Sequence, residues 1–345
     1  MILILNINMR DVQIAIDYRT IVRNIKSLRA KLAPGVMFCA VIKSNAYGIG
    51  DVEVAKTIAP YVDMFAVARM SESIRLRETG DITRPILLLG PCEDFALAIK
   101  HSIAVTITSM EEMHSAARAS LGGKISIHIE INTGMNRFGI NNLWHLRSMI
   151  RIASRHPNIE VAGLCTHMSS AREIDAQLRR FAPYRAMIKR FYPRAIIHAA
   201  CSEGIHHRGA HFDMVRIGKA MYGGIAGYKT ALTLRARVVA IQQIAKGASI
   251  GYKSLFTANQ TMTIGIVNCG YAVAGFLTLG VPTHVYIDKT PCKVLGSICM
   301  DTIFIDITHA PDSLGKSVTI ISPTQNTLSQ LADKSGHSAA KILCL

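Results

Sequence analysis

The stretch Met37-Phe-Cys-Ala-Val-Ile-Lys-Ser-Asn-Ala-Tyr-Gly48 joins a short apolar run to a polar turn. Residues 37–42 are almost uniformly apolar, which predicts a buried strand. This strand delivers Lys43, and then Tyr47, into a strand-to-helix turn. An amine at the end of a buried strand is partly desolvated, which lowers its pKa and suits it to Schiff-base chemistry. A lysine after a strand is more often a solvated loop residue, so this interpretation depends on what the rest of the chain carries.

Seven further apolar runs follow through the first two thirds of the chain, at 64–68, 86–89, 104–107, 125–131, 159–165, 195–200 and 212–216. Segments long enough for helices lie between them, for example 51–60, 71–79, 109–119, 142–154 and 173–191. Alternating strands and helices predict parallel βαβ units, and eight of them predict a closed (β/α)8 TIM-like barrel over 10–228. In such a barrel the active site lies where the strands end.

The pattern changes after Gly223-Gly224, where turn-separated strands replace the alternation. These predicted strands are 232–244, 261–268, 283–288, 292–299, 302–307 and 317–322. They predict a second, mostly β domain over 229–345, which a strand at 1–9 could join.

Composition and charge argue against a nucleic-acid-binding, membrane or metal-binding protein. Half of the 345 residues are hydrophobic, and the net charge of +16 is spread along the chain without a basic tail or a nucleic-acid-binding motif, so no nucleic-acid partner is expected. Polar residues from Asn6 to Asp11 interrupt the apolar start too early for a signal peptide or a membrane span. The eight cysteines form no Cys-x-x-Cys pair and no metal-ligand spacing. We expect a cytoplasmic protein with no membrane association and no metal.

Polar residues stand at the ends of five of the eight predicted strands. They are Lys43 and Tyr47 after the first strand, Arg137 after the fifth, His167 after the sixth, Ser202 after the seventh and Arg216 at the end of the eighth. Taken singly, a core histidine or a structural ion pair is the commoner role for such residues. Because the whole set occurs in order at the strand ends, it favours an active site.

Six motifs, spread over both predicted domains, resemble those of the alanine racemases. They are Ala40-Val-Ile-Lys-Ser-Asn-Ala-Tyr-Gly48, Thr133-Gly-Met-Asn-Arg137, Thr166-His167, Val215-Arg-Ile-Gly218 with Met221-Tyr-Gly223, Gly251-Tyr252 and Met300-Asp301. The resemblance runs from about Val12 to near the end of the chain. It implies a pyridoxal 5'-phosphate enzyme with a barrel and a β domain, acting as a homodimer with shared active sites.

The resemblance also implies a two-base mechanism that interconverts L-alanine and D-alanine, supplying D-alanine for peptidoglycan. Lys43 would hold the cofactor as an internal aldimine and then serve as acid and base on one face. Tyr252, from the other subunit, would serve on the opposite face. Racemisation needs both, because a planar carbanion loses its proton on one side and regains it on the other.

The remaining implied roles concern cofactor and substrate binding. Arg216 would face the pyridine nitrogen, and His167 would stack near the ring and link Arg216 to Tyr252. The phosphate would be held by Tyr47, Ser202 and the backbone N–H groups of Gly218 and Lys219. Arg137 and the backbone N–H of Met300 would receive the substrate carboxylate or hold the region of the ring hydroxyl.

The chain departs from the family pattern at four places. Glu130 stands where a lysine is common, seven residues before the motif arginine, and its negative charge could orient Arg137. Gly270-Tyr-Ala-Val-Ala274 replaces Gly-Tyr-Ala-Asp-Gly, so Val273 stands where an aspartate is usual, and Ser297 stands where an arginine is usual. The chain reaches Leu345 without the usual Arg-x-Pro-Arg-x-Tyr ending, whose tyrosine would help to hold the phosphate.

Other functions are compatible with parts of this pattern. A racemase of the same family could act on serine or another amino acid, and a catalytically impaired homologue could still bind pyridoxal phosphate. A barrel amino-acid decarboxylase fits less well, because Tyr252 and the Thr133–Arg137 run favour a racemase. Nucleic-acid binding rests on charge alone, and salt-dependent retention on DNA would test it.

Overall fold

The computed structural model describes residues 3–5 and 12–344. Contacts divide the chain into two compact units, one formed by Ile25–Gly218 and the other by Met1–Asn24 together with Lys219–Leu345. The first division falls inside α1 (Tyr18–Arg29), and the second falls directly after β10 (Met214–Ile217).

The unit Ile25–Gly218 is built on a closed barrel of eight strands, as predicted. The strands are β3 (Met37–Val41), β4 (Met64–Val67), β5 (Ile86–Leu88), β6 (Ile103–Ile107), β7 (Ile125–Glu130), β8 (Ile159–Cys165), β9 (Ile196–His198) and β10. Every neighbouring pair is parallel, and β10 closes the barrel by pairing with β3, with Met214 opposite Met37. Each strand coincides with one of the apolar runs.

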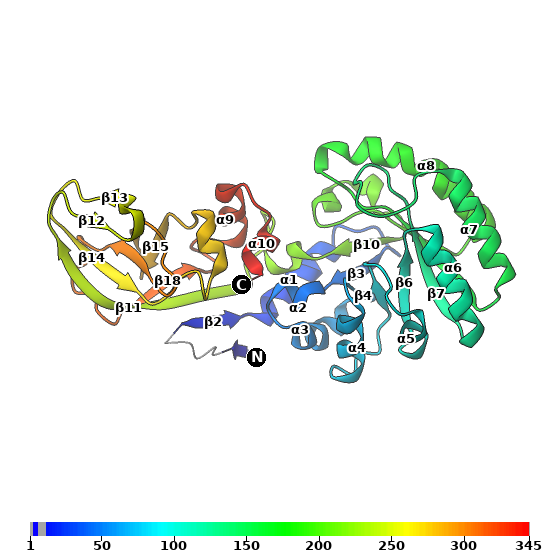
Figure 1. The fold of residues 1–345 in the computed structure, drawn as a ribbon, viewed down its shortest axis with the longest axis horizontal. Helices are drawn as coiled ribbons and strands as arrows, with labels where there is room; N and C mark the ends of the chain where they lie inside the picture. Colours follow the sequence, from blue (N-terminus) through cyan, green and yellow to red (C-terminus); the bar gives the residue numbers. More distant parts are fainter. Residues whose placement is uncertain (1–2, 6–11, 345) are drawn as a thin grey trace. The chain divides into compact units, whose positions relative to one another are not determined.

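The barrel strands are apolar throughout because both of their faces are covered. All four residues of β4 and of β10 are buried, as is expected of parallel strands with side chains packed inside the barrel and helices packed outside it. Figure 1 shows α4 to α8 around the outside of the strands. The helices are α2 (Lys43–Tyr47), α3 (Asp51–Ile58), α4 (Met70–Glu78), α5 (Phe95–Lys100), α6 (Met110–Ala119), α7 (Leu143–Arg155) and α8 (Ile174–Phe191).

Short 3-10 turns complete the connections: η1 (Ala59–Tyr61), η2 (Ser120–Gly122), η3 (Ala171–Glu173), η4 (Glu203–His206) and η5 (Arg208–Ala210). The connection from β9 to β10 consists of η4 and η5, where a barrel of this type ordinarily has a helix.

The other unit is mostly β, as predicted. Its strands are β1 (Leu3–Leu5), β2 (Gln13–Ile16), β11 (Leu232–Ile244), β12 (Ser249–Ile250), β13 (Phe256–Thr257), β14 (Met262–Val267), β15 (His284–Ile287), β16 (Thr290–Leu295), β17 (Ile303–Asp306) and β18 (Ser317–Ile321). Its helical segments are η6 (Lys219–Tyr222), η7 (Tyr252–Ser254), η8 (Gly275–Leu279), α9 (Leu328–Ser335) and α10 (Ala339–Leu343).

The long strand β11 organises this β unit. It pairs antiparallel with β2, β18 and β14 along its length, and β14 leads through β17, β16 and β15 back to β18. At the N-terminal side, β1 pairs with β2. Residues 1–2 and 6–9 of the strand expected at 1–9 lie outside the described residues. Among the described helices, none has the length and apolar character needed to cross a membrane.

Candidate active site

The turn that follows β3 has an unusual backbone. Four consecutive residues that are not glycine, Ser44 to Tyr47, have φ values of 54°, 54°, 51° and 60°, so Lys43 leads into a left-handed turn. Left-handed helical backbone costs about 1–2 kcal/mol per L-residue. Bonds within the turn offset part of this cost, since the Gly48 N–H donates to the Ser44 oxygen at 2.9 Å and the Ala46 N–H donates to the Ile42 oxygen at 2.9 Å.

The left-handed turn brings Tyr47 against Gly218. A Cβ atom at Gly218 would lie 2.2 Å from the Tyr47 hydroxyl oxygen, so only glycine fits beneath this ring. The Gly218 N–H donates to the Ser202 Oγ at 3.1 Å. Two hydroxyls and a backbone amide therefore gather beyond the ends of β9 and β10. They are the kinds of group that hold an anion such as phosphate, and barrel enzymes often bind phosphate at this place. Lys219 follows directly and begins η6 in the β unit.

Arg216 lies inside the barrel on β10, with an exposure of 4%. Its guanidinium donates to the main-chain carbonyl oxygens of Thr166 at 2.8 Å and of His198 at 3.0 Å. It also donates to the His198 Nδ1, whose ring in turn meets His128, with 2.8 Å between His198 Nε2 and His128 Nδ1. These neutral acceptors fix the orientation of the guanidinium.

His167 follows β8 and is the point on which the predicted cationic side chains act. Burial, with a smaller contribution from the positive charges of Arg216, Arg137 and Lys43, lowers its pKa to about 3. Electrostatic effects of this kind weaken with distance, so Lys43, Arg137 and Arg216 lie near His167 at the same end of the barrel. His167 is consequently neutral near pH 7.

Glu130 ends β7 and is buried, with an exposure of 8%. Burial raises the pKa of its carboxyl, whereas the charges of Arg216 and Arg137 lower it. The loop between Glu130 and Ile140 folds back on the strand, since the Ile140 N–H donates to the Glu130 oxygen at 3.0 Å and Ile131 forms a bridge with Ile140. Arg137 lies in this loop and its side chain is partly over the ring of Phe138.

Gln177 on α8 is a fully buried residue that sequence reasoning missed. Its amide nitrogen donates to the Thr133 Oγ1 and to the His167 oxygen, both at 3.0 Å, and its amide oxygen accepts from the Ser169 N–H at 2.8 Å. Thr133 also contacts the Thr166 hydroxyl at 2.7 Å. Gln177 therefore ties the Arg137 loop to the His167 loop. In the sequence, Gln177 is one polar residue within an amphipathic helix pattern, so nothing indicated that it would be buried and link two loops.

Glu72, His128 and His198 were also missed. Each is a buried polar residue on a helix or strand of the barrel unit, with exposures of 6%, 1% and 0%. His198 and His128 were hidden within runs that were interpreted only as strands, and Glu72 occupies an ordinary helix-capping position. The roles of these three residues could be recognised only once the structure showed their hydrogen-bond partners.

Tyr252 and Met300 belong to the β unit, where both are exposed, at 69% and 55%. The Ser297 hydroxyl donates to the main-chain carbonyl oxygen of Tyr252 at 3.1 Å. Ser297 therefore holds the main chain at Tyr252. The segment at Met300 runs against Gly270, where a Cβ atom would lie 2.3 Å from the Met300 oxygen. The main chain is therefore held by Ser297 at Tyr252 and packed against Gly270 at Met300.

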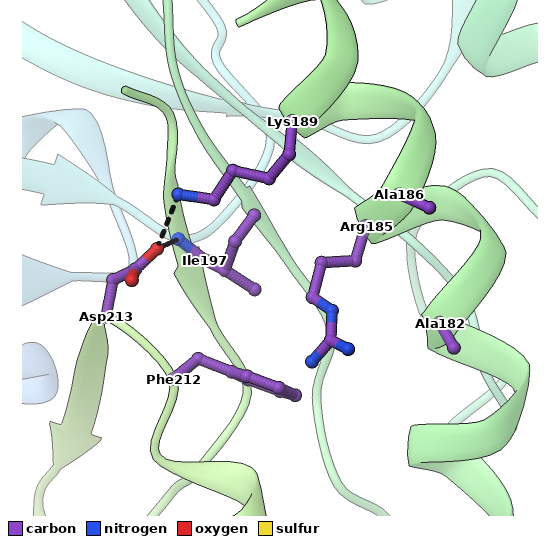
Figure 2. Close-up of a pocket in the computed structure, with 7 residues that line it drawn as sticks. All are labelled: Ala182, Arg185, Ala186, Lys189, Ile197, Phe212 and Asp213. Atoms are coloured by element: carbon purple, nitrogen blue, oxygen red, sulfur yellow. Dashed lines mark hydrogen bonds and ion pairs between the residues drawn. The ribbon is translucent and has the colours of Figure 1, made fainter. Parts of the chain in front are cut away.

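A separate hollow of about 360 Å3 lies beside α8 at the start of β10, away from the strand ends that carry the site residues (Figure 2). Lys189 pairs with Asp213 at 3.0 Å, and Asp213 also accepts from the Ile197 N–H at 2.8 Å. The Arg185 guanidinium lies 4.7 Å from the centre of the Phe212 ring. The described residues contain no group of three His, Cys, Asp or Glu side chains that could hold a metal ion.

Comparisons with known proteins give matches over nearly the whole chain. The profile "Alanine racemase, N-terminal domain" matches residues 16–226, and "Alanine racemase, C-terminal domain" matches residues 231–345. The alanine racemase of Geobacillus stearothermophilus is 32% identical over 95% of this chain and 88% of its own length.

Solved structures agree with these matches. A Clostridium difficile alanine racemase superposes with a TM-score of 0.83 at 30% identity, covering 95% of this chain and 90% of the other. A Bacillus anthracis alanine racemase with bound L-Ala-P superposes with a TM-score of 0.85 at 28% identity, covering 97% of this chain and 92% of the other. Matches to both domain profiles and to full-length relatives show that the chain belongs to the alanine racemase family.

Proposed function

We propose that this chain interconverts L-alanine and D-alanine with pyridoxal 5'-phosphate as cofactor, by proton transfer on two opposite faces of the substrate. The observation that carries the proposal is that Tyr47, Ser202 and the Gly218 amide meet where β9 and β10 end, in a chain of the alanine racemase family. The D-alanine would supply cell-wall peptidoglycan, and we place the reaction in the cytoplasm.

The groups gathered beyond β9 and β10 fit the phosphate of the cofactor. Tyr47 and Ser202 offer hydroxyls, Gly218 offers an amide, and the glycine leaves the space that a side chain would fill. We propose that Tyr47, Ser202 and the backbone amides of Gly218 and Lys219 hold the phosphate, and that the Lys43 amine holds the cofactor covalently. When bound, the cofactor withdraws electrons from the substrate Cα and so makes its proton removable.

Arg216 would face the pyridine nitrogen of the cofactor. A guanidinium is charged at all physiological pH values and donates hydrogen bonds without giving up a proton. Its orientation is fixed by the Thr166 and His198 oxygens at 2.8 and 3.0 Å, so it would present a donor whose proton stays on the arginine. The ring nitrogen would then remain unprotonated, which limits electron withdrawal and favours return of the proton to the Cα atom.

Two groups would exchange the Cα proton. The Lys43 amine would hold or release it on one face. The Tyr252 hydroxyl, supplied by a second copy of the chain in a homodimer, would do so on the other face. His167 would lie between Arg216 and Tyr252, and as a neutral ring it can accept a hydrogen bond without adding positive charge.

The substrate carboxylate would be received by Arg137 and the Met300 backbone N–H. A guanidinium binds a carboxylate through two parallel hydrogen bonds, which fixes orientation as well as charge. The buried Glu130 lies near enough for the charge of Arg137 to lower its pKa, so its own negative charge would help to direct the arginine.

Proton NMR in D2O tests the proposal directly. The purified chain is incubated with pyridoxal phosphate and L-alanine, and the chirality of the product is then determined. Loss of the Cα proton signal with formation of D-alanine is the expected result. Exchange with full retention of L-alanine would contradict the two-face mechanism. Absence of exchange with alanine but exchange with serine would favour the racemase of another amino acid, and absence of exchange with any amino acid would favour a binding homologue without activity.

A further inference from the structure

The main chain on both sides of Lys43 is fixed by hydrogen bonds to other elements. Before it, the Ile42 N–H donates to the main-chain oxygen of Ala66, a residue of β4, at 2.9 Å. After it, the Ser44 N–H donates to the Glu72 Oε1 at 2.5 Å. We propose that Glu72 is a positioning residue that aims the Lys43 side chain, an inference that rests on the proposed function of Lys43.

The physical reason is the planarity of the peptide bond. The Ser44 N–H lies in the same plane as the Cα, carbon and oxygen of Lys43. An acceptor that fixes the direction of this N–H therefore fixes the rotation about the Lys43 Cα–C bond. On the other side, the Ile42 oxygen lies in the peptide plane that precedes Lys43 and accepts from the Ala46 N–H at 2.9 Å, so both peptide planes beside Lys43 are held.

Glu72 can play this role because its carboxylate is itself immobile. The residue has an exposure of 6%, and its second oxygen, Oε2, accepts from the Ala68 N–H at 2.8 Å and from the Arg69 N–H at 3.0 Å. One carboxylate thus caps the first turn of α4 with one oxygen and holds the residue after Lys43 with the other. Hydrogen bonds to a charged acceptor are about twice as strong as neutral ones.

The same helix also holds the far end of the turn. Arg75, three residues after Glu72 and therefore on the same helical face, donates to the buried Asp51 carboxylate, with 2.5 Å between Nη2 and Oδ2. The Asp51 N–H donates to the Asn45 Oδ1 at 3.0 Å. α4 is therefore hydrogen-bonded to both ends of residues 44–51, to Ser44 through Glu72 and to Asp51 through Arg75.

The left-handed backbone makes such an external hold necessary. Four successive left-handed L-residues are strained and persist only where the surroundings over-determine them. If the Ser44 N–H lost its acceptor, the start of the turn could relax and redirect Lys43. The Glu72 carboxylate therefore keeps the strained turn in place, and with it the direction of the Lys43 side chain.

Helix capping alone does not account for Glu72. Glu112 occupies the equivalent position on α6, two residues after its first residue Met110, and it caps that helix through the Thr108 N–H at 2.6 Å and the Thr108 Oγ1 at 2.9 Å. Those bonds stay within the segment that leads into its own helix. Only Glu72 of the two reaches back to the residue after Lys43, so Glu112→Gln is a matched control.

Two substitutions separate positioning from capping. Glu72→Asp keeps the charge and can still cap α4, but it is one methylene too short to reach Ser44. Glu72→Gln keeps the length but has one acceptor oxygen for contacts that use two. Amide hydrogen exchange, resolved to single residues by fragmentation mass spectrometry, is measured on the full chain with and without pyridoxal phosphate.

We expect the Ser44, Gly48 and Gly50 amides to exchange at least about tenfold faster in both variants, because a charge-assisted hydrogen bond is lost. With bound pyridoxal phosphate, kcat for alanine should fall while KM changes little. In Glu112→Gln the exchange of residues 44–50 should match the unsubstituted chain.

Unchanged exchange of residues 44–50 in both Glu72 variants would overturn the inference, whatever their activity. Faster exchange with an unchanged kcat would also overturn it, since the turn would then be held without effect on Lys43. If the unsubstituted chain fails to racemise alanine but the variants exchange faster, the proposed function fails while the hold of Glu72 on the turn stands.

Discussion

His198 lies between a donor and an acceptor inside the barrel, and this placement sets its tautomer. The Arg216 guanidinium can only donate, so the His198 Nδ1 that faces it carries no proton. The proton of His198 is then on Nε2 and is donated to the His128 Nδ1, 2.8 Å away. Both rings are neutral, because burial and the charge of Arg216 lower their pKa values, that of His128 to about 4.

These buried histidines make stability depend on pH. Unfolded His128 takes up a proton below about pH 6.5, whereas folded His128 does so only near pH 4. The contribution to stability is therefore fully present above pH 6.5 and is lost progressively as the pH falls from there toward pH 4. We predict that His128→Gln reduces the loss of unfolding free energy between pH 7 and pH 5 by roughly 2 kcal/mol, measured by urea denaturation.

The control for this prediction is His114→Gln, which replaces an exposed histidine on α6. It should leave the pH dependence as it is in the unsubstituted chain. Equal pH dependence in all three proteins would show that His128 is not held neutral by the fold.

Glu130 gives a second prediction at the scale of one residue. If its negative charge directs Arg137, Glu130→Gln should lower kcat/KM for alanine more than Glu130→Asp, which keeps the charge. Because burial raises the pKa of this carboxyl, the charge is lost as the pH falls toward that raised pKa, and kcat/KM should fall with it. That acidic fall should be absent in Glu130→Gln. Equal activities of the two variants would show that the charge does not matter.

At the scale of elements, the pairing of β7 with β8 contains a shift of register. Ile127 is opposite Val161, but the next residue, His128, is opposite Gly163, so β8 carries one extra residue. The shift is a β-bulge, which re-aims the side chains around it. It places Gly163 beside the His128 ring, where a Cβ atom would lie 2.2 Å from the His128 Nδ1.

We therefore predict that Gly163→Ala is strongly destabilising. Its methyl group would also meet the Ile196 oxygen at 2.9 Å, so backbone as well as the imidazole would have to move. Overpacking of this kind costs typically about 1–3 kcal/mol, and it would also displace His198 and Arg216. Gly122→Ala is the matched control, because no atom lies within 4 Å of its Cβ position. Urea denaturation of the two variants measures the difference, and equal midpoints would contradict the packing argument.

The sequence predicted the barrel elements well because each strand is buried on both faces. Runs such as residues 37–42 and 64–68 are therefore apolar without interruption, and the segments between them carry helix-forming patterns. Some elements were not predicted, because no clear local pattern marks them. They are the 3-10 turns η4 and η5 between β9 and β10, and the helices α9 and α10 of the mostly β unit.

The candidate site was predictable only in part. Lys43 and Arg216 could be placed at strand ends because a barrel brings the ends of its strands together. The left-handed turn could not be predicted, since Ser44 to Tyr47 include no glycine that would indicate positive φ. Glu72 and Gln177 could not be predicted either, because their partners are loop amides and carbonyls that no side-chain pattern reveals. The catalytic and binding roles of the site residues remain predictions.

At the scale of the whole molecule, the proposal requires that two copies of the chain complete each site. Lys43 and Tyr252 belong to different units of the chain. If Tyr252 acts in the site of a second copy, a dimer that joins a Lys43→Ala chain to a Tyr252→Phe chain has one site with both residues intact. We predict that mixing and refolding the two inactive variants restores about a quarter of the activity, since half of the random dimers are mixed and each has one intact site.

Each variant refolded alone provides the control and should stay inactive. If the mixture also stays inactive while native mass spectrometry shows mixed dimers, the two residues act within one chain and the shared site is wrong. If the protein is monomeric at all concentrations, the homodimer is wrong as well.

Among the described residues, the hydrogen-bond partners of Arg216 are all neutral, although the side chain is 4% exposed. Glu130 is close enough for the charge of Arg216 to lower its pKa, so the buried cation is partly compensated, and an electron-rich occupant of the barrel mouth would stabilise it further. Occupancy and folding are then coupled equilibria, and a ligand that binds only the folded state stabilises it. If the chain binds pyridoxal phosphate as proposed, loss of this ligand should therefore shorten the time that the chain resists proteolysis, because the unliganded protein would unfold more often.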